Sequence, residues 1–193
     1  MRIIAGQHKG RRLKSLKGQG EHLRPTSDRV REALFSIISP RLPGSIFLDL
    51  YAGTGAVGIE ALSRGAKQVI FVESHKDSLH ILKENVQLCG VQHQSVIMAQ
   101  TTEAWLHTWG DKHMAETFNI IFADPPYNLS LGDTLFSHAS IKHMLDPEGL
   151  FVIEHASHTI ISPMTSPDFL PQHSYRYGDT TLTTLTHRNP QKK

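Results

Sequence analysis

Five short apolar runs, separated by segments with helical periodicity, constrain the fold of this chain more than any other feature. The runs cover residues 46–50, 69–72, 95–98, 120–123 and 150–153. Short apolar runs of this kind are typical of strands buried on both faces of a sheet. Because helical segments lie between them, the chain consists of repeated βα units. This alternation predicts an α/β fold with a parallel, doubly wound sheet and helices on both faces.

End signals locate the helices between these runs. Apolar residues recur with helical spacing from Val30 to Ile38, with Thr26 or Ser27 as the expected N-cap. A second helix is expected from Ser74, with Asp77 as its capping-box partner. Gly90 should end that helix, and its apolar face includes Cys89, which is most simply a core residue. Trp105 and Trp109, four residues apart on a short helix, fit helix packing.

The last part of the chain carries a different signal. Residues 174–177 and 180–185 flank Gly178-Asp179, which predicts an antiparallel hairpin. At 193 residues the chain fits one full domain, with a tail at 189–193 expected to be disordered. It has no apolar stretch of the roughly 18 residues that span a bilayer. Cys89 is the one cysteine, so an intrachain disulfide is excluded, and we expect a cytoplasmic protein.

Charge is distributed unevenly along the chain. Residues 1–41 hold ten Lys and Arg against three acidic residues, a balance of +7, whereas the remainder has a balance of −5. A basic arm on an acidic body indicates a phosphate-rich partner, although a solvated arm that aids solubility has the same composition. Gly6 and Gly10 favour a loop or hairpin in the first half of the arm.

A glycine-rich turn, Gly53-Thr54-Gly55, joins the first predicted strand to its helix. Glycines let the backbone approach a ligand closely, and Glu73, at the end of the second strand, can accept hydrogen bonds from a ribose diol. Glu73 could instead cap its own helix. The loop also matches Gly-x-Gly-x-x-Gly, as in nicotinamide dehydrogenases. Asp49, however, would place negative charge near a pyrophosphate, and it suits the cationic methionine end of S-adenosyl-L-methionine.

Asp124-Pro125-Pro126-Tyr127 follows the fourth predicted strand, at the edge where ligands bind in open α/β sheets. The two prolines stop the strand. A carboxylate and a carbonyl here can accept both hydrogens of an exocyclic base amine while an aromatic ring stacks on the base. A Pro-Pro turn with a solvated Asp is the alternative. Together with the glycine-rich loop, the motif favours methyl transfer to a base.

These motifs resemble those of class I S-adenosylmethionine-dependent methyltransferases that act on base amines. Residues 2–6, 9–13 and 24–35 of the arm narrow the resemblance to the RsmD-type guanine-N2 methyltransferases of bacterial 16S ribosomal RNA, and residues 61–66 continue it. The resemblance implies a Rossmann-like sheet of seven strands with an antiparallel C-terminal hairpin. It also implies transfer of one methyl group to a guanine of 16S rRNA, within the small ribosomal subunit or an assembly intermediate. S-adenosyl-L-homocysteine would be the product.

The site expected from these motifs has three parts. The catalytic residues are Asp124, Pro125 and Tyr127. The cofactor would be bound by Asp49, Tyr51, Gly53, Thr54, Gly55, Glu73, Gln100, Thr101 and Asp124. The RNA would be bound by Arg11, Arg12, Arg24, Thr26, Arg29 and Arg31. Arg24 and Arg29 could instead pair with Asp28 or Glu32. The sequence contains no cluster of Cys and His residues that would indicate a metal site.

Residues 1–41 are expected to form an RNA-binding extension and residues 42–188 the methyltransferase domain of a monomer. Three other functions fit parts of the sequence. A DNA adenine-N6 methyltransferase would use the Asp-Pro-Pro-Tyr motif in the same way, but such enzymes usually need an added target-recognition region. An NAD-dependent oxidoreductase would account for the glycine-rich loop but not for the Asp-Pro-Pro-Tyr motif. A non-catalytic RNA-binding assembly factor would keep the basic arm without needing Asp124.

Overall fold

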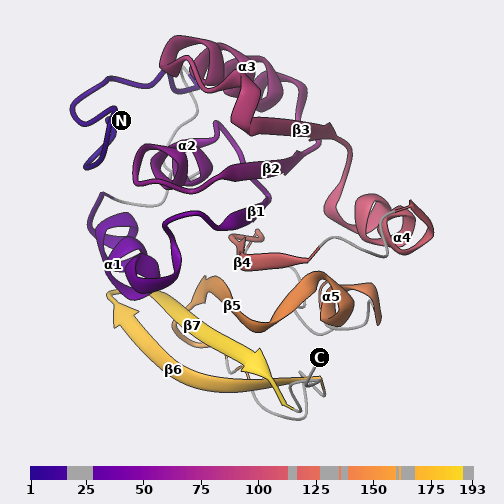
Figure 1. Cartoon of the computed structure of the whole chain (residues 1–193). Coiled ribbons are helices and arrows are strands. Elements are labelled where there is room, and N and C mark those ends of the chain that lie inside the picture. Colours follow the sequence, from indigo (N-terminus) through magenta and orange to yellow (C-terminus); the bar gives the residue numbers. More distant parts are fainter. Residues whose placement is uncertain are drawn as a thin grey trace.

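The structure is a computed structural model, and it describes residues 1–16, 28–112, 117–126, 135, 139–159, 161 and 168–188. The strands are β1 (Ile46–Leu50), β2 (Gln68–Glu73), β3 (Ser95–Ala99), β4 (Phe118–Ala123), β5 (Leu145–Ala156), β6 (Phe169–Tyr177) and β7 (Thr180–His187). The α-helices are α1 (Asp28–Ile38), α2 (Ala56–Ser63), α3 (Lys76–Cys89), α4 (Thr102–Lys112) and α5 (Ala139–Met144). All five predicted strands and the C-terminal hairpin are present (Figure 1).

The strands form one seven-stranded sheet in the order β3-β2-β1-β4-β5-β7-β6. The first five strands along the chain are parallel, and β7 runs antiparallel to both β5 and β6. From β1 the chain first extends the sheet through β2 and β3, then returns to add β4 on the other side of β1. Ligands bind where the strand order reverses in this way, so the carboxyl ends of β1 and β4 are the expected place for a site.

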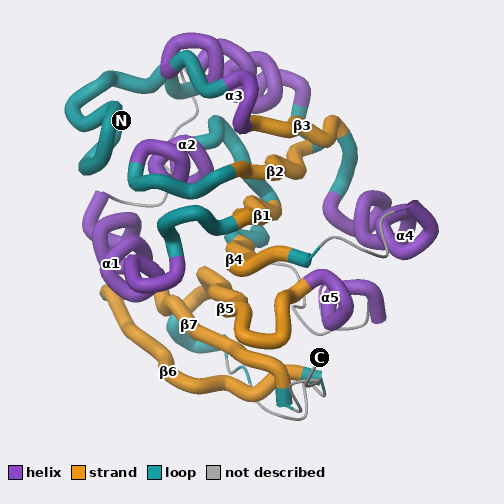
Figure 2. Tube along the Cα trace, in the orientation of Figure 1, coloured by secondary structure: helices purple, strands orange, loops and turns teal. Residues whose placement is uncertain are grey.

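Helices cover both faces of the sheet (Figures 1 and 2). Successive residues of a strand point to opposite faces, so Phe47 belongs to the core shared with α1, α2 and α3, while Leu48 belongs to the other core. Trp105 and Trp109 of α4 are buried in that second core with their ring centroids 4.9 Å apart. Their predicted role in helix packing is confirmed.

The first residues of the chain form a small hairpin, as their glycines predicted. Arg2 and Arg12 make an isolated antiparallel bridge, and Gly6 and Gly10 both have positive φ. We call residues 1–14 the N-terminal hairpin. It lies against α2 and α3, with Leu13 buried in the core that these helices share with α1 (Figure 2). The N-terminal hairpin is therefore packed onto the sheet domain.

One predicted helix start is wrong. The helix after β2 begins at Lys76 rather than Ser74, and its N-cap, His75, makes no side-chain cap hydrogen bond. The amides of Ser74 and His75 instead donate to the Glu73 carboxylate, so the residue at the end of β2 does the work assigned to a Ser74–Asp77 capping box. Cys89 is buried at the other end of α3, as expected. The predicted N-cap of α1, Thr26 or Ser27, lies outside the described residues, as does the tail.

In the part of the chain that the structure describes, no helix is both long and apolar enough to cross a membrane.

Candidate functional site

The loop after β1 is shaped by three residues with positive φ. Tyr51 has φ +60°, Gly53 +56° and Gly55 +80°. Gly55 also lies close to α3, since a Cβ there would lie 2.2 Å from Cδ1 of Leu82, whose side chain would have to move. A Cβ at Gly53 would meet none of the described atoms within 4 Å, so this point of the loop faces open space. The loop is thus supported by α3 on one side and open to a ligand on the other.

Asp49 lies at the base of this loop and is almost fully buried, with 1% of its surface exposed. One carboxylate oxygen, Oδ2, accepts a hydrogen bond of 2.9 Å from the amide of Gly58 on the first turn of α2. Burial raises the pKa of Asp49 to about 8, because one hydrogen bond does not replace the lost hydration, and the charges of Asp124 and Glu73 raise it further. Asp49 is a buried carboxyl that would ionise readily beside a bound cation.

Glu73, at the end of β2, holds two loops together. Its Oε2 accepts from the amide of Gly53 at 2.7 Å, and its Oε1 accepts from the amides of Ser74 and His75 at 2.7 and 2.6 Å. The alternative that Glu73 serves the start of its own helix is therefore part of its role. The same carboxylate also binds the glycine-rich loop, which orients it at the mouth of the site.

Asp124 and Pro125 follow β4, directly beside β1. The register pairs Leu50 with Ala123, so Asp124 emerges next to the start of the glycine-rich loop. Asp124 is half-buried and Pro125 is buried. Asp49, Glu73 and Asp124 thus come from three adjacent strands, close enough for the charges of the other two to raise the pKa of Asp49. The expected stacking residue, Tyr127, lies outside the described residues.

Three other expected cofactor residues lie on the β3 side of the loop. Thr101 caps α4, because its hydroxyl accepts from the amide of Ala104 at 3.2 Å. The hydroxyl of Tyr51 donates to Oε1 of Glu103 at 3.2 Å, and burial, followed by the charge of Glu103, raises the pKa of Tyr51. Gln100 is half-buried just after β3. Thr101 and Tyr51 have clear structural roles beside any contact with a ligand.

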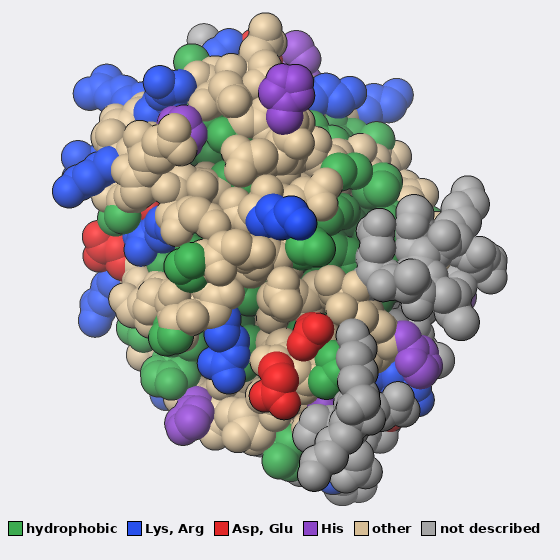
Figure 3. Space-filling model, viewed as in Figure 1, with side chains coloured by type: hydrophobic (Ala, Val, Ile, Leu, Met, Phe, Trp, Pro, Cys, Tyr) green, Lys and Arg blue, Asp and Glu red, His purple; other side chains and the backbone are tan. Residues whose placement is uncertain are grey.

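Of the expected RNA-binding arginines that the structure describes, three are exposed and one is buried. Arg11, Arg12 and Arg29 are exposed. On the face seen in Figure 3, Lys and Arg side chains lie mainly along the upper and left margins, over α3, α2 and the N-terminal segment. Arg24 and Thr26 lie outside the described residues.

Arg31 contradicts the expectation, since only 1% of its side chain is exposed. Its Nη2 donates to the carbonyl of Arg2 at 2.6 Å and pairs with Asp28 at 3.0 Å, and its Nε lies 4.0 Å from Oε2 of Glu60. The guanidinium is buried, and its Nη2 is hydrogen-bonded to internal partners. Arg31 therefore ties α1 to the N-terminal hairpin and α2, and it is not available to RNA.

Two residues that sequence reasoning missed organise the N-terminal hairpin. Glu60 of α2 is fully buried and accepts from the amides of Ile4 and Ala5 and from Nε of Arg64. Its signal in the sequence was an acid in a helix otherwise made of apolar and small residues. Asn85 of α3 is also fully buried, and it bonds to Lys14 and to Thr54 of the glycine-rich loop. It stands between Glu84 and Val86 without any pattern to mark it.

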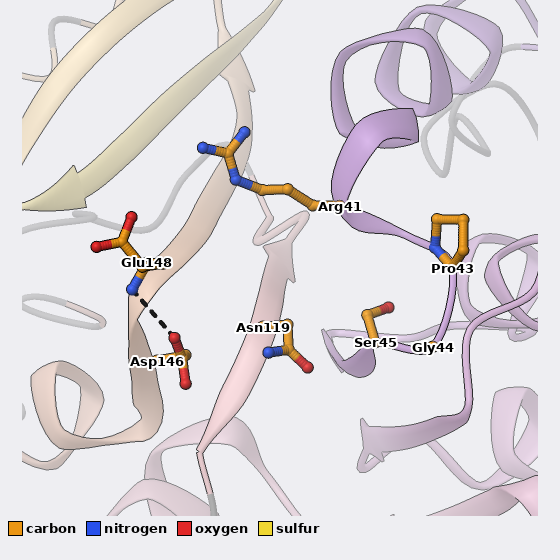
Figure 4. A pocket seen from close by; sticks show the side chains of 7 residues that line it. All are labelled: Arg41, Pro43, Gly44, Ser45, Asn119, Asp146 and Glu148. Atoms are coloured by element: carbon orange, nitrogen blue, oxygen red, sulfur yellow. Dashed lines mark hydrogen bonds between the residues drawn. The ribbon is translucent and has the colours of Figure 1, made fainter. Parts of the chain in front are cut away.

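Two open cavities lined by described residues lie away from this site. One of about 390 Å³ is formed at the amino ends of β1, β4 and β5 by Arg41, Ser45, Asn119, Asp146 and Glu148, with Pro43 and Gly44 (Figure 4). Its side chains are mostly engaged with the protein. Asn119 accepts from the amide of Ile46, and Asp146 accepts from the amide of Glu148. This cavity is at the opposite ends of the strands from Asp49 and Asp124.

Among the described residues, no group of three His, Cys, Asp or Glu side chains is arranged to hold a metal ion. His155 of β5 is buried, with its ring nitrogens hydrogen-bonded to the carbonyl of Ala156 and the hydroxyl of Thr183. Burial lowers its pKa, so it is a neutral core residue.

Comparison with known proteins finds similar sequences and structures that are named as methyltransferases. The family model described as Conserved hypothetical protein 95 matches residues 1–186. Ribosomal RNA small subunit methyltransferase D of Haemophilus influenzae is 37% identical over 156 residues, covering 80% of this chain and 78% of the relative. The protein of the same name from Escherichia coli K12 is 34% identical over 154 residues, with 80% and 74% covered. The solved structure of Escherichia coli yhhF superposes with a TM-score of 0.82 at 28% identity, covering 99% of each chain.

Proposed function

The chain belongs to the family described as Conserved hypothetical protein 95, a family of RsmD-type methyltransferases, and from this premise we propose that it methylates ribosomal RNA with S-adenosyl-L-methionine as the donor. More narrowly, we propose the exocyclic N2 amine of a guanine in 16S rRNA as the acceptor. The observation that carries the proposal is the convergence of Asp49, Glu73 and Asp124 at the carboxyl ends of three adjacent strands.

The residues around the glycine-rich loop fit a cationic, adenosine-containing cofactor. Asp49 is a buried carboxyl whose pKa of about 8 would fall beside a positive charge, which suits the amino and sulfonium groups of the donor. Glu73 keeps its carboxylate at the mouth of the loop, where a ribose diol could donate to it. A dinucleotide pyrophosphate would meet the same three carboxylates, which disfavours the oxidoreductase alternative. When bound, the donor supplies an electrophilic methyl group.

Asp124 and Pro125 would prepare the acceptor amine. A guanine amine is a weak nucleophile because its lone pair is delocalised into the ring. Hydrogen bonds from its two hydrogens to the Asp124 carboxylate and the Pro125 carbonyl would favour a pyramidal nitrogen and offset the developing positive charge. Holding the amine in line with the methyl group supplies much of the remaining acceleration. Tyr127, two residues after Pro125, is proposed to stack on the base.

The choice of RNA as substrate rests on the relatives and on the exposed cations of the first forty residues. Arg11, Arg12 and Arg29 are exposed and suited to phosphate contact, and we retain Arg24 and Thr26 as proposed contacts. We propose that residues 1–41 form the RNA-binding surface of a cytoplasmic monomer. Its substrate would be the small subunit or an assembly intermediate.

One experiment tests both the chemistry and the substrate. The protein is incubated with labelled S-adenosyl-L-methionine and, separately, with 16S rRNA, small-subunit particles and DNA, and the methylated base is then mapped by mass spectrometry. We expect N2-methylguanine in the ribosomal substrates and no label in DNA. Label on adenine in DNA would replace the proposal with the DNA methyltransferase, and absence of label from every nucleic acid would favour a non-catalytic binding factor.

A further inference from the structure

Asn85 links the N-terminal hairpin to the glycine-rich loop. We infer that Asn85 is a positioning residue through which RNA docking on the hairpin and binding of the methyl donor strengthen each other. The inference rests on the proposed function, since it assumes that the loop binds S-adenosyl-L-methionine and that the hairpin faces RNA.

Each polar atom of the Asn85 side chain is engaged, and the side chain is fully buried. Its Nδ2 donates to the carbonyl of Thr54 at 2.9 Å and to the carbonyl of Lys14 at 3.1 Å. Its Oδ1 accepts from the amide of Lys14 at 2.8 Å. Both donor hydrogens and the acceptor are therefore used by two backbone segments far apart in the sequence. A movement of one segment that breaks this link leaves buried polar groups unpaired on the other, which is costly.

The same face of α3 supports the loop by packing. Leu82, three residues before Asn85 on α3, contacts Gly55 so closely that a Cβ at Gly55 would lie 2.2 Å from its Cδ1. Thr54 is thus held by a hydrogen bond and its neighbour Gly55 by van der Waals contact, both from α3. The N-terminal segment runs beside α3 in Figure 2. The position of the loop is in this way tied to that of the hairpin.

Other contacts fasten the hairpin to α3 without reaching the loop. The ammonium of Lys14 pairs with Glu84 at 2.7 Å, and Arg11 donates to the carbonyl of Leu88. Glu84 is adjacent to Asn85 but its side chain is 33% exposed. Removing the Glu84 carboxylate therefore loosens the hairpin at the same residue, Lys14, while the bond between Asn85 and Thr54 stays intact. Glu84→Gln is the matched control.

Asn85→Asp removes the bond to Thr54 and keeps one of the two bonds to Lys14. An aspartate has nearly the same shape and can still accept from the Lys14 amide, and at alkaline pH, where it is ionised, it cannot donate to the carbonyl of Thr54, so all variants are compared there. Because coupling between two binding sites is reciprocal, it is measurable from either side. The cofactor should slow hydrogen exchange of the Lys14 amide, and RNA should raise the affinity for the cofactor.

The experiment measures both directions with S-adenosyl-L-homocysteine, which binds without turnover. Amide exchange at Lys14 is followed by mass spectrometry with and without saturating ligand, and binding of labelled ligand is measured with and without 16S rRNA. For the wild type and Glu84→Gln we expect at least about fivefold slower exchange and about fivefold tighter binding, the lower range for coupled sites. For Asn85→Asp both effects should vanish. Its binding without RNA should weaken about fivefold, as expected when one hydrogen bond to the cofactor loop is removed; the bond to the Lys14 carbonyl, lost as well, does not touch that loop.

The outcomes separate this inference from the proposed function. A wild type that binds S-adenosyl-L-homocysteine but shows no change in Lys14 exchange would overturn the coupling and leave the methyltransferase standing. Full coupling retained in Asn85→Asp would do the same. A wild type that binds no ligand would overturn the proposed function and the coupling together. If Asn85→Asp does not fold, the wild-type exchange measurement still decides.

Discussion

The buried carboxyl of Asp49 makes the stability of the ligand-free protein depend on pH in a specific direction. Its ordinary pKa of 3.8 is raised to about 8 in the folded state, mainly by burial. Between these values the folded protein holds a proton that the unfolded chain releases. The resulting stabilisation is fully present below pH 3.8 and is lost as pH rises towards 8. The window in which the wild type loses stability is therefore about pH 4 to pH 8.

The perturbation is Asp49→Asn. The amide keeps an oxygen acceptor for the Gly58 N–H but has no proton to lose in this range. Each pH unit within the window is worth about 1.4 kcal/mol for one proton, so the wild type should lose about 3–4 kcal/mol between pH 5 and pH 8 relative to the variant. The difference is expected because ionised Asp49 would have a single amide hydrogen bond and two neighbouring acids.

The assay is urea denaturation of both proteins, without cofactor, at pH 5, 6, 7 and 8. The quantity compared is the difference between their free energies of unfolding at each pH, because titrating groups that do not interact with Asp49 act on both proteins alike and cancel. Wild type and variant whose free energies change in parallel from pH 5 to pH 8 would refute the reasoning. They would mean that Asp49 is already ionised in the folded state, with its charge stabilised by water.

Three further expectations concern the site and the arm. Glu73→Ala should weaken binding of S-adenosyl-L-homocysteine by about 2 kcal/mol, the range of a charge-assisted hydrogen bond, and calorimetry that finds unchanged affinity would contradict this. Asp124→Ala should abolish methyl transfer while calorimetry finds the cofactor affinity nearly unchanged, because the carboxylate is proposed to face the base amine; turnover at the wild-type rate would make this Asp structural. Arg12→Ala with Arg29→Ala should lower the slope of log affinity for small-subunit particles against log salt by about 0.7–0.9 for each phosphate that is no longer neutralised, without changing cofactor affinity. An unchanged slope in that salt titration would remove these two side chains from RNA recognition.

The sequence predicted those features whose causes are local. The apolar run 46–50 is β1 to the residue, because a short buried strand needs little beyond apolar side chains and flanking turn residues. The glycine-rich loop has the positive φ values that its glycines predicted at Gly53 and Gly55. The position of Asp124 at the same end of the sheet as the β1 loop also followed from the pattern, since parallel strands align their carboxyl ends, whereas the strand order that puts β4 directly beside β1 came from the structure.

Only the tertiary structure decided which polar side chains are buried and what they bind. Arg31 carries the same charge as its exposed neighbour Arg29, yet it is buried because the carbonyl of Arg2 and the carboxylates of Asp28 and Glu60 surround it. The capping box expected at Ser74 does not form, because the Glu73 carboxylate at the end of β2 accepts from the amides of Ser74 and His75 instead.

The network around the N-terminal hairpin shows the physical limit most clearly. Glu60 bonds to residues 55 and 56 positions away, and Asn85 bonds to a residue 71 positions away. Periodicity and turn chemistry act over a few residues, so they predict where a strand or helix forms and which way its apolar face points. The partner of a buried polar group is whichever backbone the fold brings within about 3 Å, and that is set by the packing of the whole domain.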